Sequence, residues 1–202
     1  MLVLCCTNRI SSLPTASYVS QNKHKYYGKG TELLSLTVQQ TYVVYAMLQN
    51  FSGTWFFVAD DDFSFTEYPL AYPSLFFNMI DGRVSKYWTN PAITEVDGHR
   101  TEFRAFKEWM SDPMFYERLV DWHKTENAIF REYKELMDIE FPNPIKYKPV
   151  SYIEDDWCQC VACEHVWENF QTDSGMLRCP KCRQVLIDPR WAEPIQQEIL
   201  FI

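Results

Sequence analysis

Four cysteines near the end of the 202-residue chain are the residues best suited to chemistry. They form two Cys-x₂-Cys pairs, Cys160 with Cys163 and Cys179 with Cys182, separated by fifteen residues. Each Cys-x₂-Cys turn brings two sulfurs within reach of one ion, and two such turns complete a tetrahedral zinc site. The spacing therefore predicts one structural Zn²⁺ per chain, in a closed site without an open position for a reacting water.

The segment Trp157–Pro189 resembles the zinc-ribbon superfamily, in which a motif such as Cys179-Pro-Lys-Cys182 is a common second knuckle. The resemblance implies two short hairpins that hold the ion between them. One departure is that Glu164 and Arg183 directly follow the knuckles, where a glycine at positive φ is frequent. We therefore expect less regular turns here. Iron is a minor alternative to zinc, because four-cysteine sites accept it.

The remaining cysteine and histidine residues are weaker ligand candidates. Cys158 lies two residues before Cys160, which is the wrong spacing for a knuckle, and we expect Cys158 and His165 to lie outside the coordination sphere. Alternatives for the cluster are a reduced group without metal or a disulfide. Five of the seven cysteines lie in the last 45 residues, which favours metal binding. Thiols that bind a metal must stay reduced, so we predict that the protein is located in the cytoplasm.

No sequence motif of a known catalytic type is present, and no catalytic residue is predicted. The run Asp60-Asp61-Asp62 could bind Mg²⁺ or Ca²⁺, but a solvated turn after a buried strand is the favoured interpretation. The segment Tyr68–Pro73 places aromatic residues in an expected loop, where they could contact a partner. Arg178, Lys181 and Arg183 cluster at the second knuckle and could neutralise its thiolates.

The net charge of −8 bears on the kind of partner. An acidic chain repels phosphate backbones, so nucleic acid is an unlikely partner and a basic protein is the better prediction. No apolar run approaches the roughly 18 residues that a bilayer crossing requires, so no membrane association is predicted.

Residues 1–145 are predicted to form a small antiparallel β-rich domain, either a curved sheet or an SH3-like barrel. Its expected strands alternate with turn residues at the spacing typical of hairpins. They comprise a first strand over 2–6, a hairpin of Thr41–Leu48 with Thr54–Ala59, and a hairpin of Leu75–Ile80 with Arg83–Trp88 around Asp81-Gly82.

Two helices are expected to complete this domain, over 102–111 and 113–140. Asp112 would cap the second, with Pro113 in its first turn. That helix is predicted to be long and amphipathic and to pack on the sheet through one apolar stripe. The stripe consists of Phe115, Leu119, Trp122, Ile129, Tyr133 and Leu136. Residues 146–156 would be a linker and 157–202 the zinc ribbon and tail. The predicted fold class is α+β.

Three functions are compatible with this sequence. The favoured one is a non-catalytic, cytoplasmic protein-interaction protein, similar to an immunity or adaptor protein, that carries a structural zinc site. A nucleic-acid-associated zinc-ribbon protein is the alternative. The second alternative is an enzyme whose site is assembled from scattered residues such as Asp60–Asp62.

Overall fold

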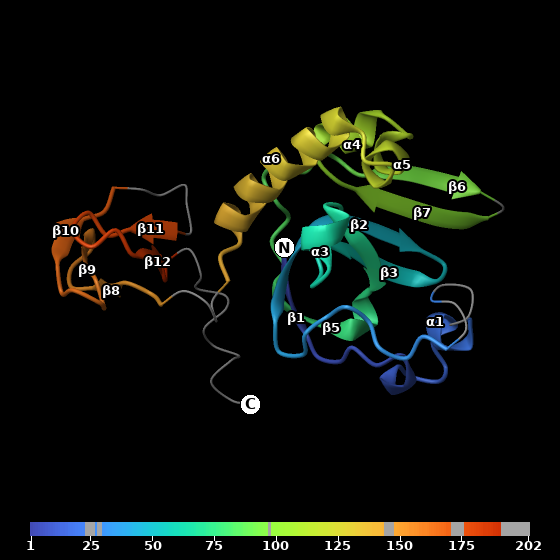
Figure 1. Cartoon of the computed structure of the whole chain (residues 1–202), viewed down its shortest axis with the longest axis horizontal. Coiled ribbons are helices and arrows are strands. Elements are labelled where there is room, and N and C mark those ends of the chain that lie inside the picture. The colour runs from blue at the N-terminus through green and yellow to red at the C-terminus, as the bar shows by residue number, and fades with distance from the viewer. Residues whose placement is uncertain (23–26, 28–29, 97, 144–147, 171–175, 191–202) are drawn as a thin grey trace. The chain divides into compact units, whose positions relative to one another are not determined.

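The computed structural model describes residues 1–22, 27, 30–96, 98–143, 148–170 and 176–190 (Figure 1). They belong to two compact units, Met1–Glu135 (unit 1) and Leu136–Ile202 (unit 2), and the boundary falls within the long helix α6, Lys124–Glu140. Antiparallel sheets and separate helices make the fold α+β, as predicted. None of the described helices combines the length and the apolar character that a bilayer crossing needs.

Unit 1 contains a seven-stranded sheet organised around the ten-residue strand β2, Thr41–Asn50. β3 (Gly53–Val58) pairs along one side of β2. The other side is shared, because β1 (Leu2–Cys5) pairs with the start of β2 and β7 (His99–Arg104) pairs with its end. The remaining strands are β4 (Leu70–Pro73), β5 (Phe77–Asp81) and β6 (Ala92–Val96). Over the described residues these strands do not close into a barrel, so the SH3-like alternative is wrong and the sheet is open.

The hairpin of β2 and β3 confirms the prediction for residues 41–59. Asn50 pairs with Gly53, whose φ of +116° is a backbone conformation that side-chain-bearing residues rarely adopt. The Ser52 N–H donates to Asn50 Oδ1 at 2.9 Å, and the Trp55 indole N–H donates to Ser52 Oγ at 2.9 Å. Side chains of the turn therefore satisfy its own polar groups and fix the register.

The predicted hairpin around Asp81-Gly82 is wrong. β5 ends at Asp81 and pairs with β1, and residues 83–88 form no strand beside it. Asp81 is almost fully buried and accepts hydrogen bonds from the Arg83 N–H (3.0 Å) and the Arg83 Nε–H (2.8 Å). Burial raises the pKa of Asp81, but these hydrogen bonds and the charge of Arg83 lower it by more. The net pKa of Asp81 is therefore below its usual value. The Asp-Gly pair thus marks a turn at the end of β5 that is held by the Asp81 side chain, not a hairpin between two strands.

Both predicted helices differ from the structure. Residues 102–104 belong to β7, and the first helix is only α4, Lys107–Ser111. The second is divided into α5 (Phe115–Val120) and α6. Asp112 does not cap a helix that begins at Pro113. It accepts from the Met114 N–H at 2.9 Å, ahead of α5.

The break between α5 and α6 lies at Trp122, which adopts a φ of +63°. The Trp122 N–H donates to the Leu119 carbonyl and the His123 N–H to the Arg118 carbonyl, a hydrogen-bond pattern that ends many helices, usually with glycine at the positive-φ position. Because the chain turns here, the residues before and after Trp122 no longer lie on one face of a single helix, as the predicted apolar stripe required. Trp122 is 52% exposed, and Phe130, absent from the predicted stripe, is fully buried.

Aromatic ring contacts confirm that α6 packs on the sheet, and Figure 1 shows the course of the helix. Phe130 meets Tyr45 of β2 edge to face at 5.4 Å between ring centroids. Phe106, which follows β7, stacks on Tyr133 of α6 at 4.1 Å. Burial of these large aromatic rings contributes to the stability of unit 1. Besides α4 and α5, the described part of unit 1 contains the short helices η1 (Ile10–Ser12), α1 (Tyr18–Gln21), α3 (Phe63–Thr66) and η2 (Ser74–Phe76).

Unit 2 contains two small antiparallel sheets. The three-stranded sheet consists of β8 (Ser151–Tyr152), β9 (Trp157–Gln159) and β10 (Val166–Glu168). The other pairs β11 (Met176–Arg178) with β12 (Val185–Ile187). The Val150 N–H donates to the Ile187 carbonyl at 2.9 Å and links them. The segment expected to be a linker, 146–156, therefore supplies β8 to this unit; its residues 146 and 147 lie outside the described part.

Candidate metal centre

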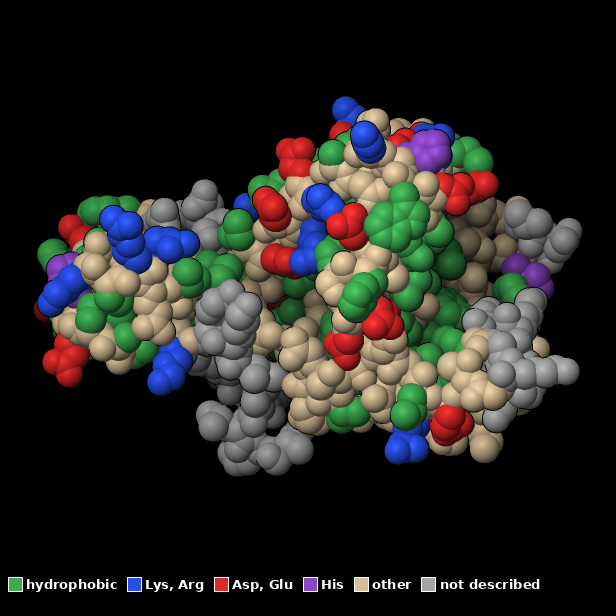
Figure 2. Space-filling view, in the orientation of Figure 1, with side chains coloured by type: hydrophobic (Ala, Val, Ile, Leu, Met, Phe, Trp, Pro, Cys, Tyr) green, Lys and Arg blue, Asp and Glu red, His purple; other side chains and the backbone are tan. Residues whose placement is uncertain are grey.

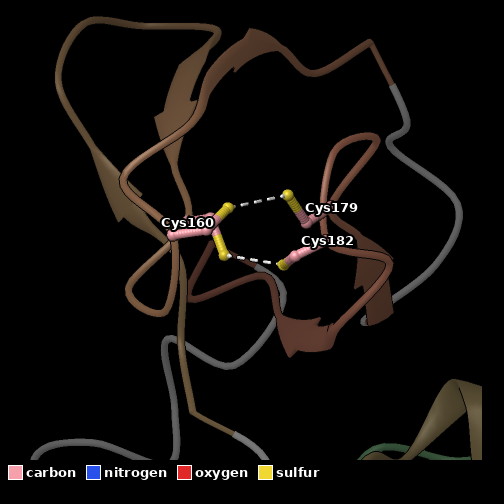
Figure 3. Close-up of side chains that lie close together, drawn as sticks. Cys160, Cys179 and Cys182 are labelled. Carbon is pink, nitrogen blue, oxygen red and sulfur yellow. Dashed lines mark hydrogen bonds between the residues drawn. The ribbon is translucent and has the colours of Figure 1, made fainter.

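Two loops in unit 2 bring the four predicted cysteines together. The sulfurs of Cys160, Cys163, Cys179 and Cys182 all lie within 4.8 Å of one another. The Cys160–Cys182 and Cys163–Cys179 sulfur pairs are each 3.7 Å apart. A regular tetrahedron with metal–sulfur bonds of about 2.3 Å has sulfur–sulfur edges of about 3.8 Å. The four cysteines are thus positioned to bind one metal ion (Figure 3).

A disulfide does not explain this cluster. Sulfurs in a disulfide are about 2.05 Å apart, far closer than the 3.7 Å seen here. All seven cysteines of the chain are free thiols. The disulfide alternative is therefore wrong.

The first knuckle, Cys160–Cys163, sits in the hairpin of β9 and β10. The Cys160 N–H donates to the His165 carbonyl at 2.9 Å, and the Glu164 N–H donates to the Cys160 carbonyl at 2.9 Å. Glu164 has a φ of +58°, which turns the chain back toward β10.

The second knuckle repeats this pattern between β11 and β12. The Cys179 N–H donates to the Gln184 carbonyl at 3.0 Å, and the Arg183 N–H donates to the Cys179 carbonyl at 2.9 Å. Arg183 has a φ of +62°. The expectation of irregular turns is therefore wrong, because the two non-glycine residues adopt the left-handed conformation and both knuckles have the same geometry.

The electrostatics of the second knuckle favour unequal ionisation of its thiols. Burial raises the pKa of Cys179, but the N–H groups of Cys182 and Lys181 and the neighbouring thiols lower the net pKa to about 7. For Cys182 the Gln184 N–H lowers the pKa, yet desolvation and the other three thiols raise the net pKa to about 12. Four thiolates at this distance repel one another, so a cation is needed to hold all four in the ionised form.

Cys158 and His165 lie outside the group of four, as expected. Cys158 is buried, and its thiol donates to the Trp167 carbonyl at 3.6 Å. Burial is the main reason that its pKa is raised to about 11. The His165 ring stacks on Trp167 at 6.3 Å between centroids. Both residues pack the module around the metal centre.

Sequence reasoning missed a second set of residues that holds the module together. Asp188 is 3% exposed and accepts hydrogen bonds from the Tyr152 hydroxyl (3.0 Å), the Asn169 amide (3.2 Å) and the Arg190 N–H (2.9 Å). The Arg190 guanidinium lies over the Tyr152 ring at 4.1 Å. Two of these partners, Asn169 and Tyr152, are 19 and 36 residues away from Asp188 in the chain, so no local sequence pattern predicts them.

The Asp60–Asp62 run has a structural role. Asp60 accepts a hydrogen bond from the Tyr72 hydroxyl, and Asp61 accepts from the Tyr42 hydroxyl at 2.7 Å. Asp62 accepts from the Ser35 hydroxyl. Asp60 is buried rather than solvated, and burial raises its pKa. Within the described part of the chain these carboxylates do not gather into a group that could hold a metal ion.

The Tyr68–Pro73 segment is not a loop throughout, because its last four residues form β4. Tyr72 is buried, so it is not available to a partner. Tyr68 is half-buried and meets Trp122 edge to face at 6.2 Å. Of the two tyrosines, only Tyr68 retains a share of the surface.

Comparison of the chain with protein-family models, curated proteins and solved structures gives no match. The resemblance of unit 2 to a zinc ribbon therefore rests on the four cysteines and the geometry described above.

The left-handed backbone at Glu164 gives a testable prediction. Glu164→Val should lower the unfolding free energy of the metal-loaded protein by on the order of 1 kcal/mol, because a β-branched residue tolerates positive φ poorly. Glu164→Gly should change it by no more than about 0.5 kcal/mol, since relief of strain offsets the added backbone entropy. Thermal unfolding of the three proteins measures both effects. Equal stability of the valine and glycine variants would contradict the assigned conformation.

Proposed function

We propose that the chain is a non-catalytic protein-interaction protein of the cytoplasm, whose unit 2 is a zinc-ribbon module stabilised by one structural Zn²⁺. The observation that carries the metal proposal is the set of four sulfurs within 4.8 Å of one another, two pairs of which have the edge length of a zinc–thiolate tetrahedron. An all-thiolate, tetrahedral site selects zinc or iron among the common metals, and zinc is the usual occupant of paired Cys-x₂-Cys knuckles.

A structural role for the metal is supported by the small core of unit 2. The hydrophobic cluster around the knuckles consists of three aliphatic side chains and three cysteines, namely Val150, Leu177, Leu186, Cys158, Cys160 and Cys179. So few aliphatic groups contribute little hydrophobic stabilisation, and domains of this size commonly depend on a metal. Four protein sulfurs would also fill every position of a tetrahedral ion, which leaves none for a substrate.

A basic protein partner is supported by charge. The chain carries a net charge of −8, and four thiolates with one Zn²⁺ would bring it to about −10. Such a surface attracts cationic proteins over distances of about a Debye length and repels phosphates. The hydrogen bonds of Asp60, Asp61 and Asp62 support the non-catalytic part of the proposal, since each carboxylate is already engaged in holding a loop or strand.

One observation favours the nucleic-acid alternative. Arg178, Lys181 and Arg183 are exposed at the second knuckle, and basic side chains gather over the part of unit 2 that holds β11 and β12 (Figure 2). However, Arg178 donates to the Arg183 carbonyl at 3.2 Å and so closes the knuckle itself. Three cations next to four thiolates also offset the charge of the site, so we favour this local role.

The metal proposal predicts that Cys179→Ser abolishes stoichiometric zinc binding and unfolds unit 2, because a hydroxyl is a poor zinc ligand and the remaining thiolates lose their common cation. Cys158→Ala is the matched control, a buried cysteine of the same unit outside the group of four, and it should retain one zinc per chain. Native mass spectrometry, with and without a chelator, measures the occupancy. Retention of zinc by Cys179→Ser would overturn the assigned ligand set.

The partner proposal predicts that the zinc-loaded chain, used as bait in native lysate, captures basic proteins that are released by raising the salt concentration. Nuclease treatment of the lysate should leave the captured set unchanged. Capture of nucleic acid alone, or of no protein at low salt, would refute this proposal and leave the zinc assignment untouched.

A further inference from the structure

The sheet of β8, β9 and β10 has one face that packs inward and one that is exposed. Cys158 and Trp167 are directly paired neighbours and belong to the core of unit 2. Since successive strand residues point to opposite faces, Trp157 and Val166 lie on the other face. Their exposed fractions are 43% and 38%, and that of Ile153, whose N–H donates to the Trp157 carbonyl, is 55%. Unit 2 thus presents apolar side chains on its outer face.

Carboxylates surround this apolar group. Glu168 is the direct cross-strand partner of Trp157, so the two side chains share the outer face and lie within contact distance. Glu154, Asp155 and Asp156 form the exposed turn between β8 and β9, next to Trp157. Asp156 is paired with Arg190 at 3.2 Å. The outer face is therefore both aromatic and acidic.

Unit 2 contains an example of a cation held by an aromatic ring and a carboxylate together. Arg190 lies over the Tyr152 ring at 4.1 Å and pairs with the Asp188 carboxylate at 3.4 Å. An aromatic face next to a carboxylate is a favourable position for a cation, and tryptophan is the strongest of the aromatic side chains in this respect. The pair of Trp157 and Glu168 repeats the arrangement on the outside of the sheet. Among the residues that the structure describes, no cation lies over Trp157.

We propose that this outer face, formed by Ile153, Trp157, Val166 and Glu168, binds a cationic segment of a partner protein. A lysine or arginine of that segment would lie over the Trp157 ring and pair with Glu168, while its aliphatic stem covers Val166. The inference rests on the basic partner proposed above and names the surface that receives it.

A shallow cavity that shares Ile153 with this outer face supports this occupant. Its volume is about 350 Å³, and it is lined by Ile153, Glu154, Asp155, Tyr152 and Arg190. Glu154 and Asp155 at its rim provide a place for a second basic side chain of the same segment. Phosphate groups would meet these carboxylates unfavourably, so charge complementarity selects a cationic peptide over a nucleic acid.

The test uses the zinc-loaded full-length chain and fluorescent twelve-residue probes. The first probe is an acetylated and amidated peptide of alternating arginine and threonine. The second has glutamate in place of arginine, and the third is a single-stranded RNA of the same length. Fluorescence anisotropy at near-physiological salt should show binding of the arginine peptide only. Trp157→Leu, which keeps an apolar side chain but removes the ring, should weaken binding about tenfold, and Trp157→Phe should weaken it less.

Two further variants separate a specific surface from general attraction of charge. Glu168→Gln should weaken binding several-fold and reduce its dependence on salt. Trp122→Leu is the matched control, because Trp122 is a comparably exposed tryptophan of unit 1, and its affinity for the peptide should equal that of the wild type. Each variant is accepted only with one zinc per chain, so a loss of folding is not mistaken for a loss of the surface.

The proposal is overturned if Trp157→Leu binds the arginine peptide as the wild type does, or if Trp122→Leu loses as much affinity. Preferential binding of the RNA would assign the face to nucleic acid. Self-association of the free protein that disappears in Trp157→Leu would assign it to a second copy of the chain. If lysate capture returns basic proteins but Trp157→Leu captures them equally well, this inference fails while the proposed function stands.

Discussion

The convergence of four thiols on one point is the constraint on which unit 2 depends. Its two small sheets are linked by the hydrogen bond from the Val150 N–H to the Ile187 carbonyl, and three of the six side chains in the hydrophobic cluster around the knuckles are cysteines. A bound cation would connect one knuckle in the β9–β10 hairpin with another between β11 and β12, and so replace the large apolar core that this unit lacks. Asp188 adds a second connection, because its carboxylate joins Tyr152 of β8 to residues that follow β10 and β12.

Features set by neighbouring residues could be predicted from the sequence. The gathering of the four cysteines follows from the Cys-x₂-Cys spacing, which brings the two sulfurs of each pair together within one turn. The hairpin of β2 and β3 follows from two apolar runs around a turn that ends at Gly53. The α+β class follows from two separate patterns. Segments rich in β-branched and aromatic residues predict strands in the first half of the chain, and apolar residues at helical spacing predict the long helix that follows. In each case the stabilising partners lie within a few residues, so that local pattern and tertiary structure agree.

Features set by distant partners could not be predicted in this way. The Asp81-Gly82 hairpin does not form because the buried Asp81 carboxylate holds Arg83 in a side-chain turn, and β5 pairs instead with the distant strand β1. Residues 102–104 form a strand because the end of β2 offers an unpaired edge, which outweighs their helical pattern. The apolar stripe failed at Trp122, because a bulky residue gives no sequence signal for positive φ. The Asp60–Asp62 carboxylates bind hydroxyls brought near by the sheet, which no local spacing reveals.

X-ray absorption at the zinc edge of the purified chain tests the central claim most directly. Four sulfur scatterers at about 2.3 Å, with no lighter ligand, are the predicted result for an ion held by Cys160, Cys163, Cys179 and Cys182. Nitrogen or oxygen neighbours at about 2.0–2.1 Å in place of a sulfur, or protein that takes up no zinc when it is supplied, would contradict the account.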